Sequence, residues 1–337
     1  MKKVLIIGAG RMGIRHAQGI VAVPEIGEIV LTDIYPSALE KAKEVLSDGR
    51  FGFYLLGDEK LKQDYSSFDI CIISATANDR LSLLELAKQF RTKHILVEKP
   101  LGQSMQQVEA LVRYVKDNAL DCVVNLNMRL YDSFVLLKKD LQSLPQFQGH
   151  KTISLNTGSL GIGANGIHYL DLLYFLLDAD DAELEFAEID EQLIPSGRGP
   201  QFSDFGGCAV LKFYKKGNDV GRALIAMSAE STVFGGWEII GRHGRIQIDE
   251  LAGKRVDILR KEESNLPINR YAADYLPAVE RTFESPFLGD LTRKWIESVF
   301  YKKVNLLPAI DESVKVHQLL FQWLSLNKTH REKFPIT

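Results

Sequence analysis

A short apolar run near the amino terminus, followed at once by a glycine-rich turn, constrains the fold of this chain more than any other feature. Val4–Ile7 is typical of a buried strand, and Gly8-Ala9-Gly10-Arg11-Met12-Gly13 follows it with G-x-G-x-x-G spacing and opens a helix. Gly8 permits the tight turn, Gly10 lets the backbone approach a pyrophosphate, and Gly13 lets helix and strand pack closely. The helix amides would then face phosphates. This context predicts that Gly8, Gly10, Arg11, Met12 and Gly13 contact a dinucleotide, although a purely structural glycine turn remains the alternative.

The first third of the chain alternates short apolar runs with amphipathic segments. We expect strands over 4–7, 28–32, 51–56, 69–74, 94–97 and 122–126, and helices over 12–23, 37–46, 80–90 and 104–119. Ser104 and Gln107 have capping-box spacing, and Asn78 or Asp79 could cap the helix that follows them. Apolar strands separated by helices indicate a parallel sheet covered on both faces. Residues 1–125 are therefore predicted to form an α/β Rossmann domain, a doubly wound parallel sheet.

After residue 126 the alternation of strands and helices gives way to a series of predicted strands. They cover 152–156, 184–194, 207–214, 223–229, 238–240, 246–249 and 256–259, with helices over 134–144, 166–177, 288–300 and 310–326. Residues 215–218 and 241–244 resemble hairpin turns. Because 337 residues exceed one ordinary core, we expect a second domain over 126–337. It is predicted to be an α+β domain with an open, mainly antiparallel sheet that serves substrate binding and oligomerisation. Its closing helix could pack back on the first domain.

Two of these strands, Gly207–Leu211 and Ala223–Ala229, are apolar on both faces. Helices can cover one face of an open sheet, and a large apolar face is rarely left in water. A second copy of the chain is the simplest cover, so we expect a homodimer or homotetramer formed through this sheet. A domain contact or a loop is the alternative cover.

Composition excludes several classes of protein. The net charge is −3 and no Lys/Arg-rich run is present, which argues against nucleic-acid binding. No secretory or membrane-spanning segment is visible, so a cytoplasmic location is expected. Cys71, Cys122 and Cys208 are widely spaced in apolar stretches, and we interpret them as buried thiols in a reducing compartment with no metal site.

Asp33 ends the second predicted strand, 20 residues beyond Gly13. A carboxylate there can accept hydrogen bonds from both hydroxyls of the adenosine ribose and would repel a 2′-phosphate. No arginine occupies the next few positions. The sequence therefore predicts NAD as the cofactor rather than NADP, unless Asp33 merely begins a turn.

Glu98-Lys99-Pro100 follows the fifth predicted strand, at the sheet edge where doubly wound folds bind ligands. A lysine at this edge could act electrostatically on a substrate oxygen beside a nicotinamide. A lysine exposed to solvent is the common alternative.

Several motifs together resemble the glucose–fructose oxidoreductase and inositol dehydrogenase family (Gfo/Idh/MocA), over essentially the whole chain. They are the segments 4–13, 74–78 (Ser-Ala-Thr-Ala-Asn), 98–101 (Glu-Lys-Pro-Leu), 127–129 (Asn-Met-Arg), 166–171 (Gly-Ile-His-Tyr-Leu-Asp), 240–246 and the closing helices. The resemblance implies a Rossmann domain followed by an open-sheet α+β domain. It also implies NAD(P)-dependent redox chemistry between a secondary hydroxyl and a ketone on a sugar, polyol or sugar derivative.

The resemblance also implies roles for individual residues. Lys99 would hydrogen-bond the reacting hydroxyl, Glu98 would lie near the nicotinamide ribose, and Thr76 and Asn78 would line the cofactor. His168 matches the family's acid/base histidine, whose ordinary pKa suits proton transfer near neutral pH.

Other residues have two open interpretations. Asp171, three residues after His168, could orient the imidazole or have a structural role. Asn127 and Arg129 could reach the substrate, although Arg129 could equally form an ion pair between domains. The segment Pro195–Gly207 is a candidate lid or an ordinary surface connection.

The sequence departs from the family at one position. The family commonly has an aspartate four residues before the histidine, and Ala164 stands there in this chain, followed by Asn165, which could hydrogen-bond substrate. Similar segments occur in members associated with bacterial surface-sugar biosynthesis. Ala164 also favours an alternative, a cofactor-binding sensor or regulatory subunit with reduced turnover. A different NAD-dependent reaction on the same scaffold, such as glycoside cleavage, is a further alternative.

Overall fold

A computed structural model describes residues 1–158, 161–195, 201–228, 231, 233, 235–261, 275–327 and 334–336. These residues form two compact units. The first comprises Met1–Leu130 and Pro286–His317 with Ile336, and the second comprises Tyr131–Ser285 and Gln318–Pro335. The sequence predicts a single boundary after residue 125, whereas the first unit runs to Leu130 and takes in a later segment of the chain.

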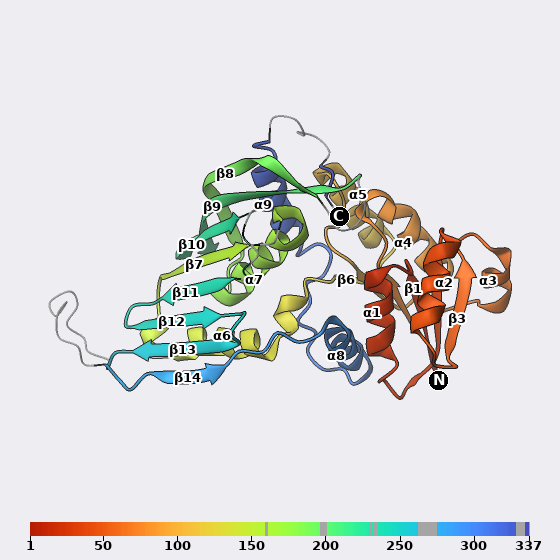
Figure 1. Cartoon of the computed structure of the whole chain (residues 1–337), viewed down its shortest axis with the longest axis horizontal. Helices are drawn as coiled ribbons and strands as arrows, with labels where there is room; N and C mark the ends of the chain where they lie inside the picture. Colours follow the sequence, from red (N-terminus) through yellow and green to blue (C-terminus); the bar gives the residue numbers. More distant parts are fainter. Residues whose placement is uncertain are drawn as a thin grey trace. The chain divides into compact units, whose positions relative to one another are not determined.

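The described part of the first unit contains a six-stranded parallel sheet in the order β3-β2-β1-β4-β5-β6, as Figure 1 shows. Its strands are β1 (Lys2–Ile7), β2 (Ile26–Asp33), β3 (Phe51–Leu55), β4 (Ile70–Ile73), β5 (His94–Val97) and β6 (Asp121–Val124). The central strands are buried almost throughout, as expected for a sheet covered on both faces. The prediction of a doubly wound α/β domain is confirmed.

The helices of this unit are α1 (Arg11–Ile20), α2 (Pro36–Val45), α3 (Glu59–Asp64), α4 (Arg80–Gln89), α5 (Met105–Asp117) and α8 (Leu288–Phe300). Ser104 caps α5 by accepting a hydrogen bond from the Gln107 amide, as its spacing predicts. The predicted cap of α4 is wrong. Residues Ala77–Asp79 instead form a 3₁₀ turn, and no side chain caps the amino terminus of α4. The sequence analysis also missed α3, a short helix capped by Asp58.

Two glycine contacts allow α1 to pack closely on both sides. A Cβ on Gly13 would lie 1.9 Å from the Gly8 carbonyl oxygen, so only glycine fits between α1 and the turn after β1. A Cβ on Gly19 would lie 2.0 Å from the Gly289 carbonyl oxygen of α8. Helix α1 is therefore held against the first turn on one side and against α8 on the other.

The described part of the second unit contains an eight-stranded sheet in the order β14-β13-β12-β11-β7-β10-β9-β8. Its strands are β7 (Lys151–Gly158), β8 (Asp181–Pro195), β9 (Ser203–Lys215), β10 (Asn218–Ser228), β11 (Gly236–Ile240), β12 (Gly244–Asp249), β13 (Lys254–Leu259) and β14 (Val279–Thr282). The pairing is antiparallel except between β7 and β10. The predicted mainly antiparallel sheet is confirmed. The sequence analysis missed β14, an exposed edge strand.

Helices α6 (Asp132–Ser143) and α7 (Ile167–Leu177) lie on one face of this sheet, and α9 (Val314–Leu324) is the last helix among the described residues (Figure 1). Every residue of α7 is buried. The strands β10 and β12 alternate between buried and more exposed side chains, as expected for a sheet covered on one face only. A π-helical turn, Ile162–Gly166, leads directly into α7.

The segment Pro195–Gly207, interpreted above as a lid or a surface connection, lies partly in a strand. Residues 196–200 lie outside the described residues, as does Ala229 at the end of a predicted strand. Ser203–Gly207 belongs to β9, where Ser203 pairs with Pro195 of β8. This part of the segment is therefore sheet and not a loop.

His317 anchors the chain just after Lys99. Its Nε2 accepts a hydrogen bond from the Leu101 amide at 3.0 Å, and its Nδ1 donates to the Ser313 carbonyl oxygen at 2.8 Å. This pattern requires the neutral imidazole. Burial and, to a smaller extent, the charge of Arg80 lower the pKa of His317 to about 4, against the opposing effect of the hydrogen bond to the Ser313 carbonyl.

We expect acid to destabilise the fold through His317. In the unfolded chain the pKa of a histidine is about 6.5, so between that pH and about 4 the unfolded chain binds a proton that the folded chain does not. The stabilisation is fully present above the unfolded pKa and is lost as pH falls through this window, up to about 3 kcal/mol. In His317→Gln, the glutamine side-chain oxygen can still accept the hydrogen bond from the Leu101 amide, but the glutamine side chain does not titrate. Denaturant titrations should therefore show wild type losing stability relative to this variant between pH 6.5 and 4. Parallel pH curves would contradict the assignment.

Candidate active site

The glycine-rich turn lies at the carboxyl end of β1, next to the end of β4. Gly8 has a φ of +105°, a conformation that favours glycine, and a Cβ there would lie 2.7 Å from the Ala75 amide nitrogen. Gly10 has no atom within 4 Å of where its Cβ would be, so its backbone is open to an approaching group. Gly10 and Arg11 are exposed and Met12 is half-buried. The turn therefore has the shape that the G-x-G-x-x-G pattern predicts.

Asp33 lies at the end of β2 and bonds directly to this turn. Its Oδ2 accepts a hydrogen bond from the Ala9 amide at 2.7 Å, and its Oδ1 accepts one from the Tyr35 amide at 2.9 Å. Each carboxylate oxygen keeps a second lone pair for another donor. The carboxylate is thus fixed beside the glycine turn.

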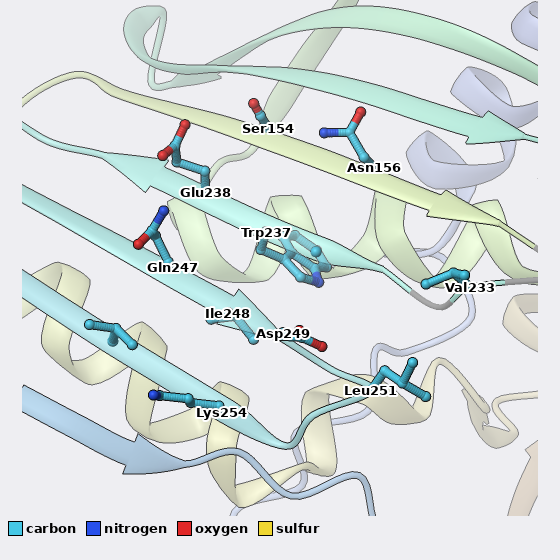
Figure 2. A pocket seen from close by; sticks show the side chains of 12 residues that line it. Ser154, Asn156, Val233, Trp237, Glu238, Gln247, Ile248, Asp249, Leu251 and Lys254 are labelled. Carbon is cyan, nitrogen blue, oxygen red and sulfur yellow. The ribbon is translucent and has the colours of Figure 1, made fainter.

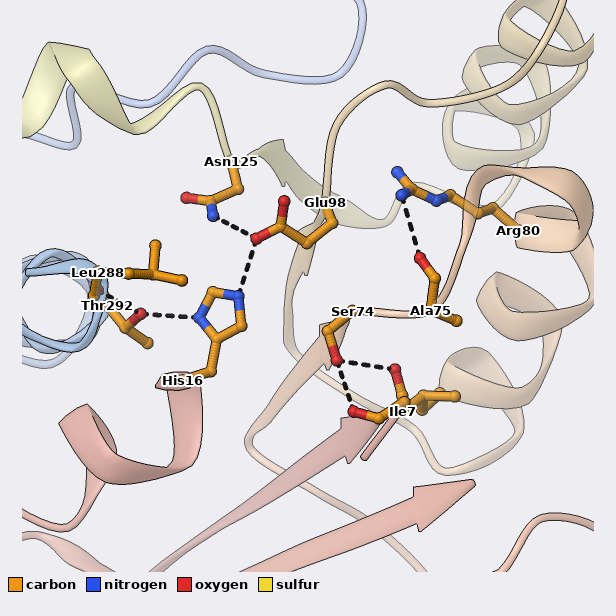
Figure 3. Close-up of polar contacts among 10 residues, drawn as sticks. Ile7, His16, Ser74, Ala75, Arg80, Glu98, Asn125, Leu288 and Thr292 are labelled. Carbon is orange, nitrogen blue, oxygen red and sulfur yellow. Dashed lines mark hydrogen bonds and ion pairs between the residues drawn. The ribbon is translucent and has the colours of Figure 1, made fainter. Parts of the chain in front are cut away.

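The turn after β4 carries Thr76 and Asn78. The Thr76 hydroxyl donates to the Asn78 side-chain oxygen at 2.6 Å. The Ser74 hydroxyl lies within 3.1 Å of the Ile7 carbonyl oxygen and 2.7 Å of the Gly8 carbonyl oxygen, and Arg80 donates to the Ala75 carbonyl oxygen (Figure 3). Sequence reasoning did not single out Ser74, although it joins the ends of β1 and β4.

Lys99 follows β5 at the same edge of the sheet and is buried, with only 5% of its surface exposed. The alternative interpretation of a solvent-exposed lysine is therefore wrong. Burying an ammonium group is unfavourable unless other groups compensate its charge. The carboxylate of the adjacent residue, Glu98, supplies negative charge nearby.

Glu98 is the centre of a buried polar network that Figure 3 shows. Its Oε1 lies 2.9 Å from His16 Nε2 and accepts a hydrogen bond from Asn125 Nδ2 at 2.6 Å. The other ring nitrogen of His16 lies 2.7 Å from the Thr292 hydroxyl, which itself donates to the Leu288 carbonyl oxygen. The network therefore joins α1, the ends of β5 and β6, and α8.

The network keeps Glu98 ionised. Burial alone would raise the pKa of Glu98. The hydrogen bond and charge of His16, the charge of Lys99 and the Asn125 hydrogen bond together lower it well below its usual range. The second carboxylate oxygen, Oε2, is buried and has no hydrogen-bond partner among the described residues. It is the atom of Glu98 that remains available to a bound molecule.

Asn127 and Arg129 lie on a 3₁₀ turn, Asn127–Leu130, just beyond β6, and both are half-buried. This position is the carboxyl edge of the first sheet, which also carries Asp33 and Lys99. The structure thus brings the predicted cofactor residues and two predicted substrate residues to one edge of the first unit.

The second unit carries the remaining predicted site residues. Ala164 and Asn165 lie in the π-helical turn before α7, and both are half-buried. His168 is on the first turn of α7 with 8% of its surface exposed, and Asp171 is fully buried one turn later. Both side chains are therefore held by the packing of α7.

Sequence reasoning missed a carboxyl group of the second unit, Glu250. Burial raises the pKa of Glu250 to about 6, although the hydrogen bond that it accepts from the Trp237 indole acts in the opposite direction. Tyr169, the residue after His168, packs edge-on against Trp237, with ring centroids 5.5 Å apart. Only the three-dimensional structure brings Glu250 near α7, because nothing in its local sequence distinguishes it.

The predicted burial of the cysteines holds for two of the three. All three are free, and Cys71 and Cys122 are fully buried, which raises the pKa of both thiols. Cys208 is half-buried, and burial raises its pKa as well. Across the described ranges, no three His, Cys, Asp or Glu side chains are grouped as a metal site would require. Among those same ranges, no helix combines the length and hydropathy of a membrane span.

Comparison with known proteins agrees with this geometry. Residues 2–126 match the model of the Gfo/Idh/MocA oxidoreductase family, described as an NAD-binding Rossmann fold. The uncharacterised oxidoreductase YrbE of Bacillus subtilis (strain 168) is 29% identical over 134 residues, which are 40% of this chain and 38% of YrbE. The chain thus aligns with well under half of this curated relative.

Solved structures show the same fold over the whole chain. An oxidoreductase from Agrobacterium radiobacter, in complex with NAD+, L-tartaric acid and magnesium, superposes with a TM-score of 0.71 at 15% identity, covering 97% of this chain and 96% of that one. The WlbA dehydrogenase from Bordetella pertussis, in complex with NADH and UDP-GlcNAcA, gives 0.67 at 13% identity, with 97% and 95% covered. At such identities the likeness establishes the fold alone.

The match over residues 2–126 agrees with the predicted family resemblance and with an NAD-binding Rossmann fold in this segment. The chain as a whole has the fold of solved oxidoreductases.

Proposed function

We propose that this protein is an NAD-dependent dehydrogenase that interconverts a secondary hydroxyl and a ketone on a sugar, polyol or sugar derivative. One observation carries the proposal: a buried lysine, Lys99, lies at the carboxyl edge of the sheet that also carries the glycine turn and Asp33. A buried ammonium at the ligand-binding edge of a Rossmann fold is suited to stabilise negative charge on a reacting oxygen.

The residues of the first unit fit an NAD molecule. The open backbone at Gly10 and the amides that begin α1 suit a pyrophosphate, and Asp33 suits the adenosine ribose. Thr76 and Asn78 would line the nicotinamide side, and Glu98 Oε2, which is buried without a partner among the described residues, would accept a hydrogen bond from a ribose hydroxyl. NAD supplies the hydride acceptor or donor, and the protein supplies orientation and electrostatics.

Lys99 and His168 have complementary roles in this reaction. In the direction of oxidation, His168 accepts the proton of the substrate hydroxyl while the carbon loses hydride. The Lys99 ammonium stabilises the negative charge that develops on the same oxygen. Asp171 supports the imidazole from the next turn of α7, and Asn127, Arg129 and Asn165 bind the substrate's other polar groups.

A sugar-like substrate is supported by the chemistry of structurally similar proteins and by the polar residues proposed to bind it. The WlbA structure contains a sugar nucleotide, UDP-GlcNAcA. A role in surface-sugar biosynthesis, which the sequence resemblance around Asn165 and His168 implies, is the pathway class that we propose. The three free cysteines fit the predicted cytoplasmic location, which stays a prediction.

Ala164 favours the second candidate function, a cofactor-binding sensor with reduced turnover. A methyl group stands where a carboxylate would assist the reaction, while the cofactor-binding residues of the first unit are intact. Under this alternative, NAD binds tightly and no substrate turns over.

The central test is turnover in wild type and in His168→Ala. NADH absorbance is followed with a panel of polyols, free sugars, uronates and nucleotide sugars. We expect activity with at least one class and a loss of about 10²- to 10⁴-fold in kcat in the variant, as for other acid–base groups. The matched control is His150→Ala, which removes a half-exposed histidine of the same unit. NAD binding without turnover on any compound would support the sensor instead.

Cofactor choice tests the role of Asp33. Wild type should bind NAD about 10- to 100-fold more tightly than NADP, because charge-assisted hydrogen bonds from the ribose contribute roughly 1.5–3 kcal/mol. Asp33→Ser combined with Ile34→Arg should reverse this preference by removing the repulsion and adding a positive charge. Isothermal titration of both cofactors provides the measurement. Equal affinities of wild type for NAD and NADP would contradict the role of Asp33.

The open face of the second sheet is the surface that we propose for homo-oligomer formation. Strand register places Phe186, Val210 and Leu224 in one row across β8, β9 and β10, continued by Ser154 of β7. Phe186 is 50% exposed and Leu224 is 42% exposed. From β7 toward β13 the same sheet has a hollow of about 530 Å³ with a mixed lining, in which Ser154, Asn156, Glu238 and Gln247 are polar and Val233, Ile248 and Leu251 are apolar (Figure 2). The apolar row suits contact with a second copy.

Sedimentation tests this interface. Wild type should sediment as a dimer or tetramer, and Leu224→Arg should shift it toward monomer because a charge would replace an apolar contact. Val304→Arg, at an exposed position of the first unit, is the control. A monomeric wild type at micromolar concentration would refute the interface.

A further inference from the structure

The turn that precedes α7 connects two residues of the proposed site. Ile162–Gly166 forms one π-helical turn, in which the Gly161 carbonyl oxygen accepts hydrogen bonds from the Asn165 and Gly166 amides at 2.9 and 3.2 Å. Asn165 belongs to this turn, and His168 follows two residues after it ends. Any shift of the turn therefore moves Asn165 directly and His168 through the start of α7.

A buried carboxylate from a distant strand holds this turn. Asp204 of β9 has 6% of its surface exposed. Its Oδ1 accepts hydrogen bonds from the Gly163 amide at 2.7 Å and from the Phe205 amide at 2.8 Å, and its Oδ2 accepts one from the Ala164 amide at 2.7 Å. Both oxygens are thus engaged by the backbone of the turn, about 40 residues earlier in the chain.

Gly161 provides the space for this carboxylate. A Cβ on Gly161 would lie 2.0 Å from Asp204 Cγ and 2.1 Å from Oδ2. The φ of Gly161 is −83°, which any residue can adopt, so the Asp204 side chain and not the backbone requires a glycine there. Asp204 and Gly161 form one steric unit.

We propose that Asp204 is a positioning residue for the reaction, which sets where Asn165 and His168 meet the substrate. This inference rests on the proposed dehydrogenase function. The charge of the carboxylate matters, because only an oxygen pair without hydrogens can accept from amides on both sides. An asparagine would turn an NH₂ group toward one of the amides.

The packing of α7 separates this role from a purely structural one. All residues of α7 are buried, including Tyr169 and Leu170, so the helix stays in place without help from Asp204. Loss of the carboxylate should therefore displace the turn and the first residues of α7 while the sheet and the rest of the helix persist. Displacements of about 1 Å at a reacting group can lower a rate 10²-fold.

The first experiment compares Asp204→Asn with wild type. We expect kcat to fall about 10- to 100-fold, with an NAD dissociation constant within about twofold of wild type because the nucleotide residues lie in the first unit. Hydrogen exchange of the Gly163 and Ala164 amides should accelerate at least about 10-fold, since both lose a charged acceptor. The control is Asp257→Asn, which removes a buried carboxylate of the same sheet that pairs with Arg255. It should lower stability without changing kcat, and an equal kcat in Asp204→Asn would overturn the proposal.

Gly161→Ala, made in the wild-type and in the Asp204→Ala backgrounds, tests the same proposal without relying on Asp204→Asn. Gly161→Ala should lower kcat in the wild-type background, because its methyl group displaces the carboxylate. In the Asp204→Ala background the same change should have little further effect, which is the non-additivity expected of two groups in contact. Additive effects would show that the two residues act separately and would contradict the steric unit.

A failure of the positioning role of Asp204 can be distinguished from a failure of the proposed dehydrogenase function. If wild type turns over no substrate in the panel, the dehydrogenase proposal fails. Amide exchange at 163 and 164 and the NMR signals of the His168 imidazole then still decide whether Asp204 holds the turn. Unchanged exchange and unchanged His168 signals in Asp204→Asn would overturn the positioning role.

Discussion

The contact between Gly13 and the Gly8 carbonyl oxygen is the constraint on which the first unit depends. Because no side chain separates them, α1 begins directly over the end of β1 and its first amides surround the glycine turn. Asp33 can bond the Ala9 amide only because the turn is held there. The parallel sheet then brings the ends of β2, β4 and β5 to the same edge.

A second level of organisation is electrostatic. Glu98 sits between a buried imidazole, a buried ammonium and an amide, and the network extends through His16 to Thr292 of α8. The close approach of Gly19 and Gly289, one turn away from His16 and Thr292, is what brings these two helices within hydrogen-bonding distance. Hydrogen bonds in such a buried network are strong because the interior has a low dielectric constant. This network fixes Glu98 just before Lys99, and His317 separately fixes Leu101 just after it.

The sequence was sufficient for features that depend on local patterns. Val4–Ile7 with the glycine turn predicted the Rossmann unit, and helix α8 was predicted with its observed bounds. The π-helical turn was not predicted, because the Asp204 carboxylate that holds it is brought to Gly163 and Ala164 only by the tertiary fold. The strand Ser203–Gly207 was not predicted, because it forms by pairing with β8. The same holds for Glu250, whose surroundings come from three separate elements. Edge strand β14 has no buried face and therefore no apolar alternation to reveal it.

The return of the chain to its first unit has a consequence for how the protein matures. Helix α8 is made after the whole second sheet, yet it supplies Thr292 and the partner surface of Gly19. During synthesis from the amino terminus, the six parallel strands can pair as soon as residue 130 has emerged, while His16 still lacks its hydroxyl partner. The first unit is therefore completed only after the second sheet has been synthesised. A nascent chain stalled before residue 288 would carry an uncovered α1, a surface for chaperones to recognise.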